Sequence, residues 1–87
     1  MKIKDGFILR EVAGSYLVVA VGSAVKDFNG MINLNESGAF LWKMLEKGST
    51  EEEMVDALVK EYNIDKNIAE TDVKAFVTKC VEAKLVK

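Results

Sequence analysis

The feature that most constrains the fold of this chain is a change of hydrophobic period at Asn35. Before it, the segment Met31–Leu34 reads as a half-buried strand, with the polar Asn33 between the apolar Ile32 and Leu34. After it, Leu41, Trp42 and Leu45 form an apolar stripe at helical spacing. The side-chain carbonyl of Asn35 suits the N-cap of such a helix, because it can accept a hydrogen bond from the first turn. The simplest interpretation is a strand that passes directly into a helix carrying a core tryptophan.

The segment before this junction is strand-like throughout. Phe7–Val12 and Ser15–Val21 are rich in β-formers, and only Ala13-Gly14 separates them, which predicts an antiparallel hairpin. The second run is apolar on both faces, so we expect the middle strand of three, covered on both sides. A longer loop, Gly22–Gly30, then leads to the third strand, Met31–Leu34.

Three helices are predicted after the strands. The first runs from about Asn35 to Lys47 and ends at Gly48. The second opens at Thr50, which stands at capping-box spacing from Glu53. The buried face of the third combines Ala69, Val73, Phe76, Val77, Cys80 and Val81. The order predicts one α+β domain over residues 1–87: a three-stranded antiparallel β-meander followed by three helices, in a winged-helix-like arrangement.

Composition narrows the classes of function. The 87 residues suffice for a single core, and a net charge of −2 argues against a broad phosphate-binding surface. There is no histidine, the usual general base and the commonest metal ligand, so we expect neither metal nor cofactor. No apolar run approaches the ~20 residues of a membrane-spanning helix. The N-terminal residues also lack the apolar core of a signal peptide, so we expect a cytoplasmic protein that binds no membrane.

Two features are candidates for catalytic chemistry. The acidic run Glu51-Glu52-Glu53 is better explained as the first turn of a helix, where acids oppose the positive helix end. Cys80, the only cysteine, lies among apolar helical positions and has no histidine to activate it, which favours core packing. We therefore expect no enzymatic activity. Peptide binding remains as the candidate function, because the free edge of a small sheet can accept an extended peptide as an extra strand.

The motifs taken together resemble a known family. Leu34-Asn35-Glu36-Ser37-Gly38-Ala39-Phe40-Leu41-Trp42 is similar to the LNxTxxxIW signature of the PqqD-like family, the coenzyme PQQ synthesis protein D group, with serine in place of threonine. Further pieces match in order: Gly48–Glu52 before a helix, Glu61-Tyr62 at its end and Asp72-Val73 with Phe76 in the last helix. The ending Ala83–Val86 also matches, although the family often has glycine where this chain has Lys84.

The resemblance implies a RiPP recognition element, a non-catalytic peptide chaperone. Such a domain binds the leader of a ribosomal precursor peptide and presents it to a modifying enzyme, often a radical SAM enzyme, as in pyrroloquinoline quinone biosynthesis. The leader would add as a strand along Gly30, Met31, Ile32, Asn33 and Leu34. Helical spacing then selects Val73, Phe76 and Val77 for the adjoining cleft, with Asp72 and Lys79 at its polar rim.

An alternative is a winged-helix regulator that binds nucleic acid. The last helix carries lysines, but Glu70, Asp72 and Glu82 offset them, so it lacks the basic excess of a DNA reader. The expected partners are therefore a leader peptide and a peptide-modifying enzyme. The free strand edge is compatible with a monomer or with an edge-to-edge homodimer.

Overall fold

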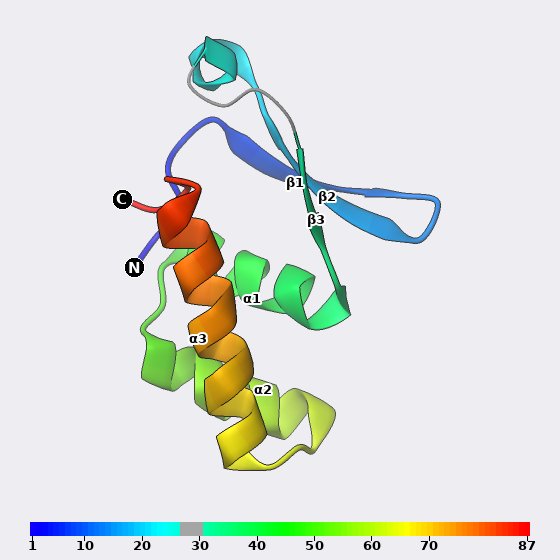
Figure 1. Cartoon of the computed structure of the whole chain (residues 1–87), viewed down its shortest axis with the longest axis vertical. Coiled ribbons are helices and arrows are strands. Elements are labelled where there is room, and N and C mark those ends of the chain that lie inside the picture. Colours follow the sequence, from blue (N-terminus) through cyan, green and yellow to red (C-terminus); the bar gives the residue numbers. More distant parts are fainter. Residues whose placement is uncertain (27–30) are drawn as a thin grey trace.

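The computed structural model describes residues 1–26 and 31–87, and these form a sheet followed by a helical layer (Figure 1). The strands are β1 (Phe7–Val12), β2 (Ser15–Ala20) and β3 (Met31–Leu34), in the antiparallel order β1-β2-β3. A short 3-10 helix, η1 (Gly22–Lys26), follows β2. The helices are α1 (Glu36–Lys47), α2 (Glu51–Tyr62) and α3 (Lys66–Glu82). The predicted α+β class and element order are confirmed.

The β1–β2 hairpin turns through two residues, Ala13 and Gly14, as predicted. Both have positive φ, 51° and 81°, which a two-residue turn of type I′ requires. Val12 pairs with Ser15 across the turn, and this pairing fixes the register of β1 against β2.

Side-chain caps set the starts of the first two helices. Asn35 accepts a hydrogen bond from the backbone N–H of Gly38 at 2.7 Å and so caps α1. At α2, Thr50 and Glu53 form the predicted capping box, with reciprocal bonds of 2.9 and 3.1 Å. These bonds to Thr50 lower the pKa of the Glu53 carboxyl below its ordinary value. The acidic run at the start of α2 is thus explained by capping.

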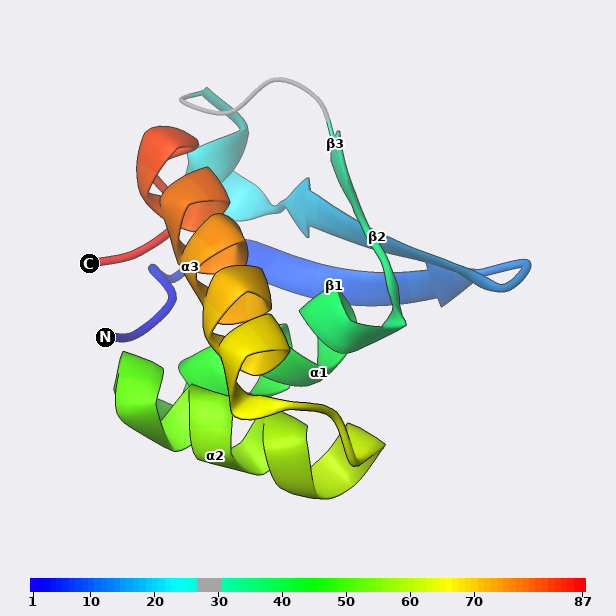
Figure 2. The same ribbon diagram turned by 60° about the horizontal axis from the view of Figure 1, so that its bottom comes forward.

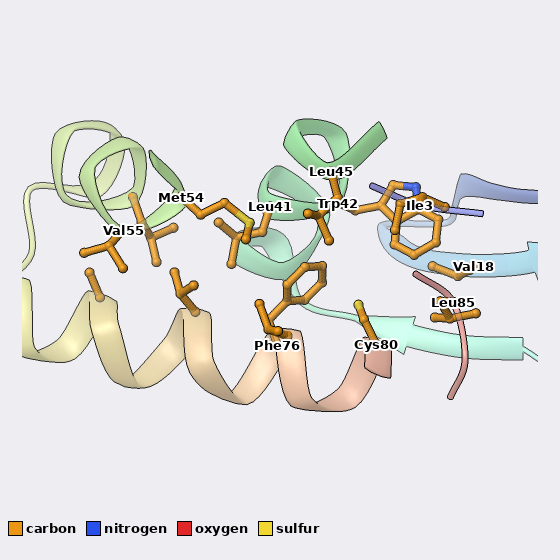
Figure 3. Packing of buried hydrophobic residues seen from close by; sticks show 14 residues of the cluster. Ile3, Val18, Leu41, Trp42, Leu45, Met54, Val55, Phe76, Cys80 and Leu85 are labelled. Carbon is orange, nitrogen blue, oxygen red and sulfur yellow. The ribbon is translucent and has the colours of Figure 1, made fainter. Parts of the chain in front are cut away.

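The core lies between one face of the sheet and the helices (Figures 2 and 3). Trp42 of α1 is fully buried and lies beside Ile3, Val18 and Leu45. The expectation that β2 would be covered on both faces is wrong. Val18 points into the core, whereas Leu17 and its outward-facing neighbours are only half-buried, because the helices all pack on the other side of the sheet.

The two ends of the chain are joined beside the helices. Ile3 and Val86 form an antiparallel bridge, and the Lys4 N–H donates to the carbonyl of Leu85 at 2.8 Å. The Ile3 N–H donates to the carbonyl of Leu45 at the end of α1. Leu85 is buried, so the C-terminal tail docks as predicted.

Lys84, the residue at which glycine is common in the resembling family, has a positive φ of 60°. A side chain with a Cβ is disfavoured there, because it approaches the following carbonyl. Lys84→Gly should therefore raise the free energy of unfolding by about 0.5–1 kcal/mol, measured by urea denaturation. Lys84→Ala is the control, since it removes the lysine side chain but keeps the Cβ and should bring no such gain. Equal stabilisation by both variants would show that the backbone conformation is not the cause.

Candidate functional site

The outer edge of β3 carries backbone groups that β2 does not use. The Val21 N–H donates to the carbonyl of Gly6 at 2.8 Å, which identifies odd-numbered residues of β2 as those that bond to β1. In an antiparallel pair the N–H and C=O of one residue point to the same side, and successive residues alternate. Even-numbered residues of β2 therefore bond to Ile32 and Leu34. The N–H and C=O groups of Met31 and Asn33 point away from the sheet.

A side chain of α3 supports this assignment. The Lys79 ammonium donates to the backbone carbonyl of Asn33 at 3.3 Å, across 46 positions of sequence. A carbonyl that faces α3 in this way is directed away from β2. The edge of β3 therefore lies beside the turn of α3 that carries Lys79. The end of β3 runs directly into α1 (Figure 1).

Between β3 and α3 the surface is hollowed into a cleft of about 270 Å³. Its apolar floor is formed by Leu34, Leu41 and Phe76, one from each of β3, α1 and α3. Asp72 and Lys79 bring a carboxylate and an ammonium group to it from α3. The remaining lining residues are small or polar: Asn35, Ser37, Gly38 and Ala75. A strand placed against β3 would send alternate side chains toward this cleft.

The capped turn at the start of α1 holds the cleft in shape. Asn35 Oδ1 accepts hydrogen bonds from both the Gly38 N–H and the Ser37 hydroxyl, at 2.7 and 3.1 Å. A Cβ at position 38 would stand 3.0 Å from that oxygen and 3.4 Å from the Cβ of Leu34. Glycine at this position therefore lets the first turn lie close against the end of β3.

The structure brings together only part of the predicted site. Leu34, Asp72, Phe76 and Lys79 line the cleft, although Phe76 is largely buried. Ile32 faces the core, and the exposed Met31 and Asn33 contribute the outward backbone. Val73 and Val77 are buried in the core, and neither lines the cleft; Val73 instead borders a separate hollow between α2 and α3. Gly30 lies outside the described residues.

Sequence reasoning misses the contributions of α1 and one position of α3. The sequence pattern assigns Leu41 to the core alone, and Ser37 and Gly38 to the helix start, yet they also border the cleft. Ala75 completes the α3 side. The available signal is the i, i+3, i+4, i+7 relation of Asp72, Ala75, Phe76 and Lys79, which places them on one helical face.

The described residues offer little for other chemistry. Cys80 is buried, and this burial raises the pKa of its thiol to about 11, so the thiol is neutral at physiological pH. Over residues 1–26 and 31–87, no group of three or more Cys, Asp or Glu residues is placed to hold a metal ion. None of the helices described there is both long and apolar enough to cross a membrane. The edge of β3 and its cleft are thus the best candidate site.

Two solved structures have a fold similar to that of this chain. A solved structure of TbiB1 in complex with the TbiA(beta) leader peptide superposes with a TM-score of 0.78 and 25% identity, covering 100% of this chain and 95% of that chain. Lasso peptide synthetase B1 complexed with the leader peptide gives 0.74 and 19% identity, covering 97% and 93%. No curated protein sequence matches significantly. The family model for coenzyme PQQ synthesis protein D (PqqD) matches residues 8–86, so the chain belongs to the PqqD family.

Proposed function

We propose that this chain is a peptide-binding domain that captures the leader of a ribosomal precursor peptide by strand addition to β3. The observation that carries the proposal is the outward-facing backbone of Met31 and Asn33 beside an apolar cleft. Two similar structures, TbiB1 and lasso peptide synthetase B1, are complexes with leader peptides. Family membership supports the same role.

Strand addition divides the recognition between backbone and side chains. Hydrogen bonds to Met31 and Asn33 would hold any extended segment, and the side chains that enter the cleft would distinguish one peptide from another. Leu34, Leu41 and Phe76 would receive an apolar side chain. Because the flexible leader must be ordered on binding, we expect an affinity of about micromolar, near −8 kcal/mol.

The leader contacts that we propose on α3 differ in one respect from those predicted from helical spacing. Val73 and Val77 are buried against the other core residues, so they would hold α3 in place beneath the peptide. Asp72, Phe76 and Lys79 would contact the leader, together with residues Met31–Leu34. Gly30, which precedes Met31 in the sequence, stays a proposed contact.

Titration of the isotope-labelled protein tests this proposal. The probes are synthetic peptides from short reading frames next to the gene, with the TbiA(beta) leader as a reference ligand. We expect the largest amide shifts at residues 30–34 and at Asp72, Ala75, Phe76 and Lys79. The control is a scrambled version of the best-binding peptide, which should shift these amides much less.

Two results would contradict the proposal. Shifts confined to β1 would place the peptide at the other edge of the sheet. Shifts of the α3 lysines that a DNA duplex reproduces would favour the alternative, a nucleic-acid-binding regulator. Concentration-dependent shifts at β3 without any peptide would instead indicate a second copy of the chain at this edge.

The partner in the next step is proposed to be an enzyme that modifies the same precursor, such as a radical SAM enzyme. In this role the domain would hold the leader while another protein reacts with the rest of the peptide. The expected result is a ternary complex: the enzyme encoded nearby should be retained on the immobilised domain more strongly when the precursor is present. Retention that the precursor does not increase would contradict peptide presentation.

A further inference from the structure

We propose that Lys79 makes the β3 edge selective for an antiparallel peptide strand that carries a carboxylate beside the residue bonded to Asn33. This inference rests on the proposed function and assigns the chemistry of the peptide that the site accepts. It concerns the carbonyl of Asn33, a backbone acceptor on this edge that already bonds to a side chain.

Without a peptide, the Lys79 ammonium occupies that acceptor. The Nζ atom lies 3.3 Å from the carbonyl oxygen of Asn33, at the place where an added strand would direct its own N–H. Capping the edge with lysine has a second consequence, because a charged group on an edge strand hinders pairing with another chain. A bound peptide must therefore take the carbonyl from Lys79 or share it.

When a peptide N–H bonds to Asn33, the ammonium is displaced but stays close to the incoming strand. If the added strand runs antiparallel to β3, as the three strands of the sheet do, the two peptide residues that flank the bonded one point their side chains to the helical side of the sheet. They are the nearest groups that a peptide can offer to Lys79. An aspartate or glutamate at either position gives the ammonium a charged acceptor in place of the neutral carbonyl.

The charge at the other end of the cleft makes the preference directional. Asp72 precedes Lys79 by seven positions on α3, which corresponds to about 10 Å along the helix axis. A peptide carboxylate is therefore attracted near Lys79 and repelled near Asp72. Uncharged side chains suit the apolar floor of Leu34, Leu41 and Phe76 between them. The cleft thus fixes both the sign of the selected charge and its position.

A display selection tests the inference and does not require the natural leader. The probe is a phage library of random peptides about 12 residues long, which exceeds the length of β3. The baits are the wild type, Lys79→Glu and Lys74→Glu. Lys74 is the matched control, because it lies exposed on the same helix beside a different hollow, and both replacements change the net charge equally.

We expect wild-type and Lys74→Glu selections to enrich aspartate or glutamate at a position two residues from the apolar residue, because alternate residues of a strand share a face. Lys79→Glu should lose that enrichment. In one selected peptide, exchanging the acid for lysine should weaken wild-type binding about fivefold to tenfold. Lys79→Glu should instead prefer the lysine peptide. High salt should reduce both preferences.

The outcomes separate this inference from the proposed function. If wild-type protein selects peptides that shift the β3 amides but carry no preferred acid, strand addition stands and the role of Lys79 is wrong. That role is equally contradicted if Lys79→Glu keeps the wild-type preference. If no peptide is enriched, or all enriched peptides bind away from β3, the proposed function is overturned and this inference with it.

Discussion

Trp42→Ala should remove about 3–5 kcal/mol from the free energy of unfolding, which is a large part of the total for a chain of this size. The indole is fully buried and lies beside Ile3, Val18 and Leu45, so it joins α1, β2 and the N-terminal segment in one core (Figure 3). Its loss leaves a cavity that three elements border. Urea denaturation followed by circular dichroism measures the effect, because the variant lacks tryptophan fluorescence.

Trp42→Phe is the control for this prediction. Phenylalanine keeps an aromatic ring in the core, and it discards an indole N–H that has no hydrogen-bond partner among the residues the structure describes. No hydrogen bond is lost, so the cost should be only about 1–2 kcal/mol. If Trp42→Ala melts within a few degrees of the wild type, Trp42 does not anchor the core, and its place in the fold must be reconsidered.

Most of the fold follows from local patterns in the sequence. Asn35 at the N-cap, the Thr50–Glu53 capping box and the Ala13-Gly14 turn each act within a few residues. These caps and turns form between neighbouring residues and do not depend on what packs against them. The bounds of strands and helices are therefore predicted to within a few residues. The start of η1 at Gly22 is missed, because a single 3-10 turn has no hydrophobic period to detect.

The coverage of each face is harder to predict. The apolar pattern of an amphipathic strand or helix shows which of its residues are buried, but not which neighbouring element covers them. Val73 and Val77 look like cleft residues by spacing, yet they belong to the face of α3 that packs in the core. Leu17 is apolar and lies on the face of β2 away from the helices. Only tertiary packing separates these cases.

The residues of β3 that face outward can be predicted only in part from the sequence. The two-residue turn after Val12 fixes which residues of β2 bond to β1 and, through the pairing of Leu17 with Asn33, which residues of β3 face outward. The first step is readable from the sequence, whereas the second needs the β2–β3 register. The approach of Lys79 to Asn33 spans 46 positions and carries no local signal at all.

Proline at two adjacent positions of β3 should have opposite effects on binding and folding. Asn33→Pro removes an N–H that faces away from β2, so the sheet should survive and its melting temperature should change by only a few degrees. Peptide binding should weaken at least about tenfold, because one main-chain hydrogen bond is lost and the proline ring crowds the incoming strand. Ile32→Pro removes an N–H that bonds to β2 and should cost about 3 kcal/mol of stability. Calorimetric titration with a peptide that binds the wild type, together with thermal denaturation, measures both effects.

Asn33→Ala is the matched control, because it removes the same side chain but keeps the N–H. Since that side chain is exposed on the face away from the core, the alanine variant should bind peptide almost as the wild type does. Binding lost equally in the alanine and proline variants would show that the asparagine side chain, and not the backbone, holds the peptide. Full binding by a folded Asn33→Pro would place the peptide away from this edge. Comparison of Ile32→Pro with Asn33→Pro therefore tests which residues of β3 direct their N–H groups away from β2. Comparison of Asn33→Pro with Asn33→Ala tests whether the backbone N–H of Asn33 holds the peptide. Either prediction can fail while the other holds.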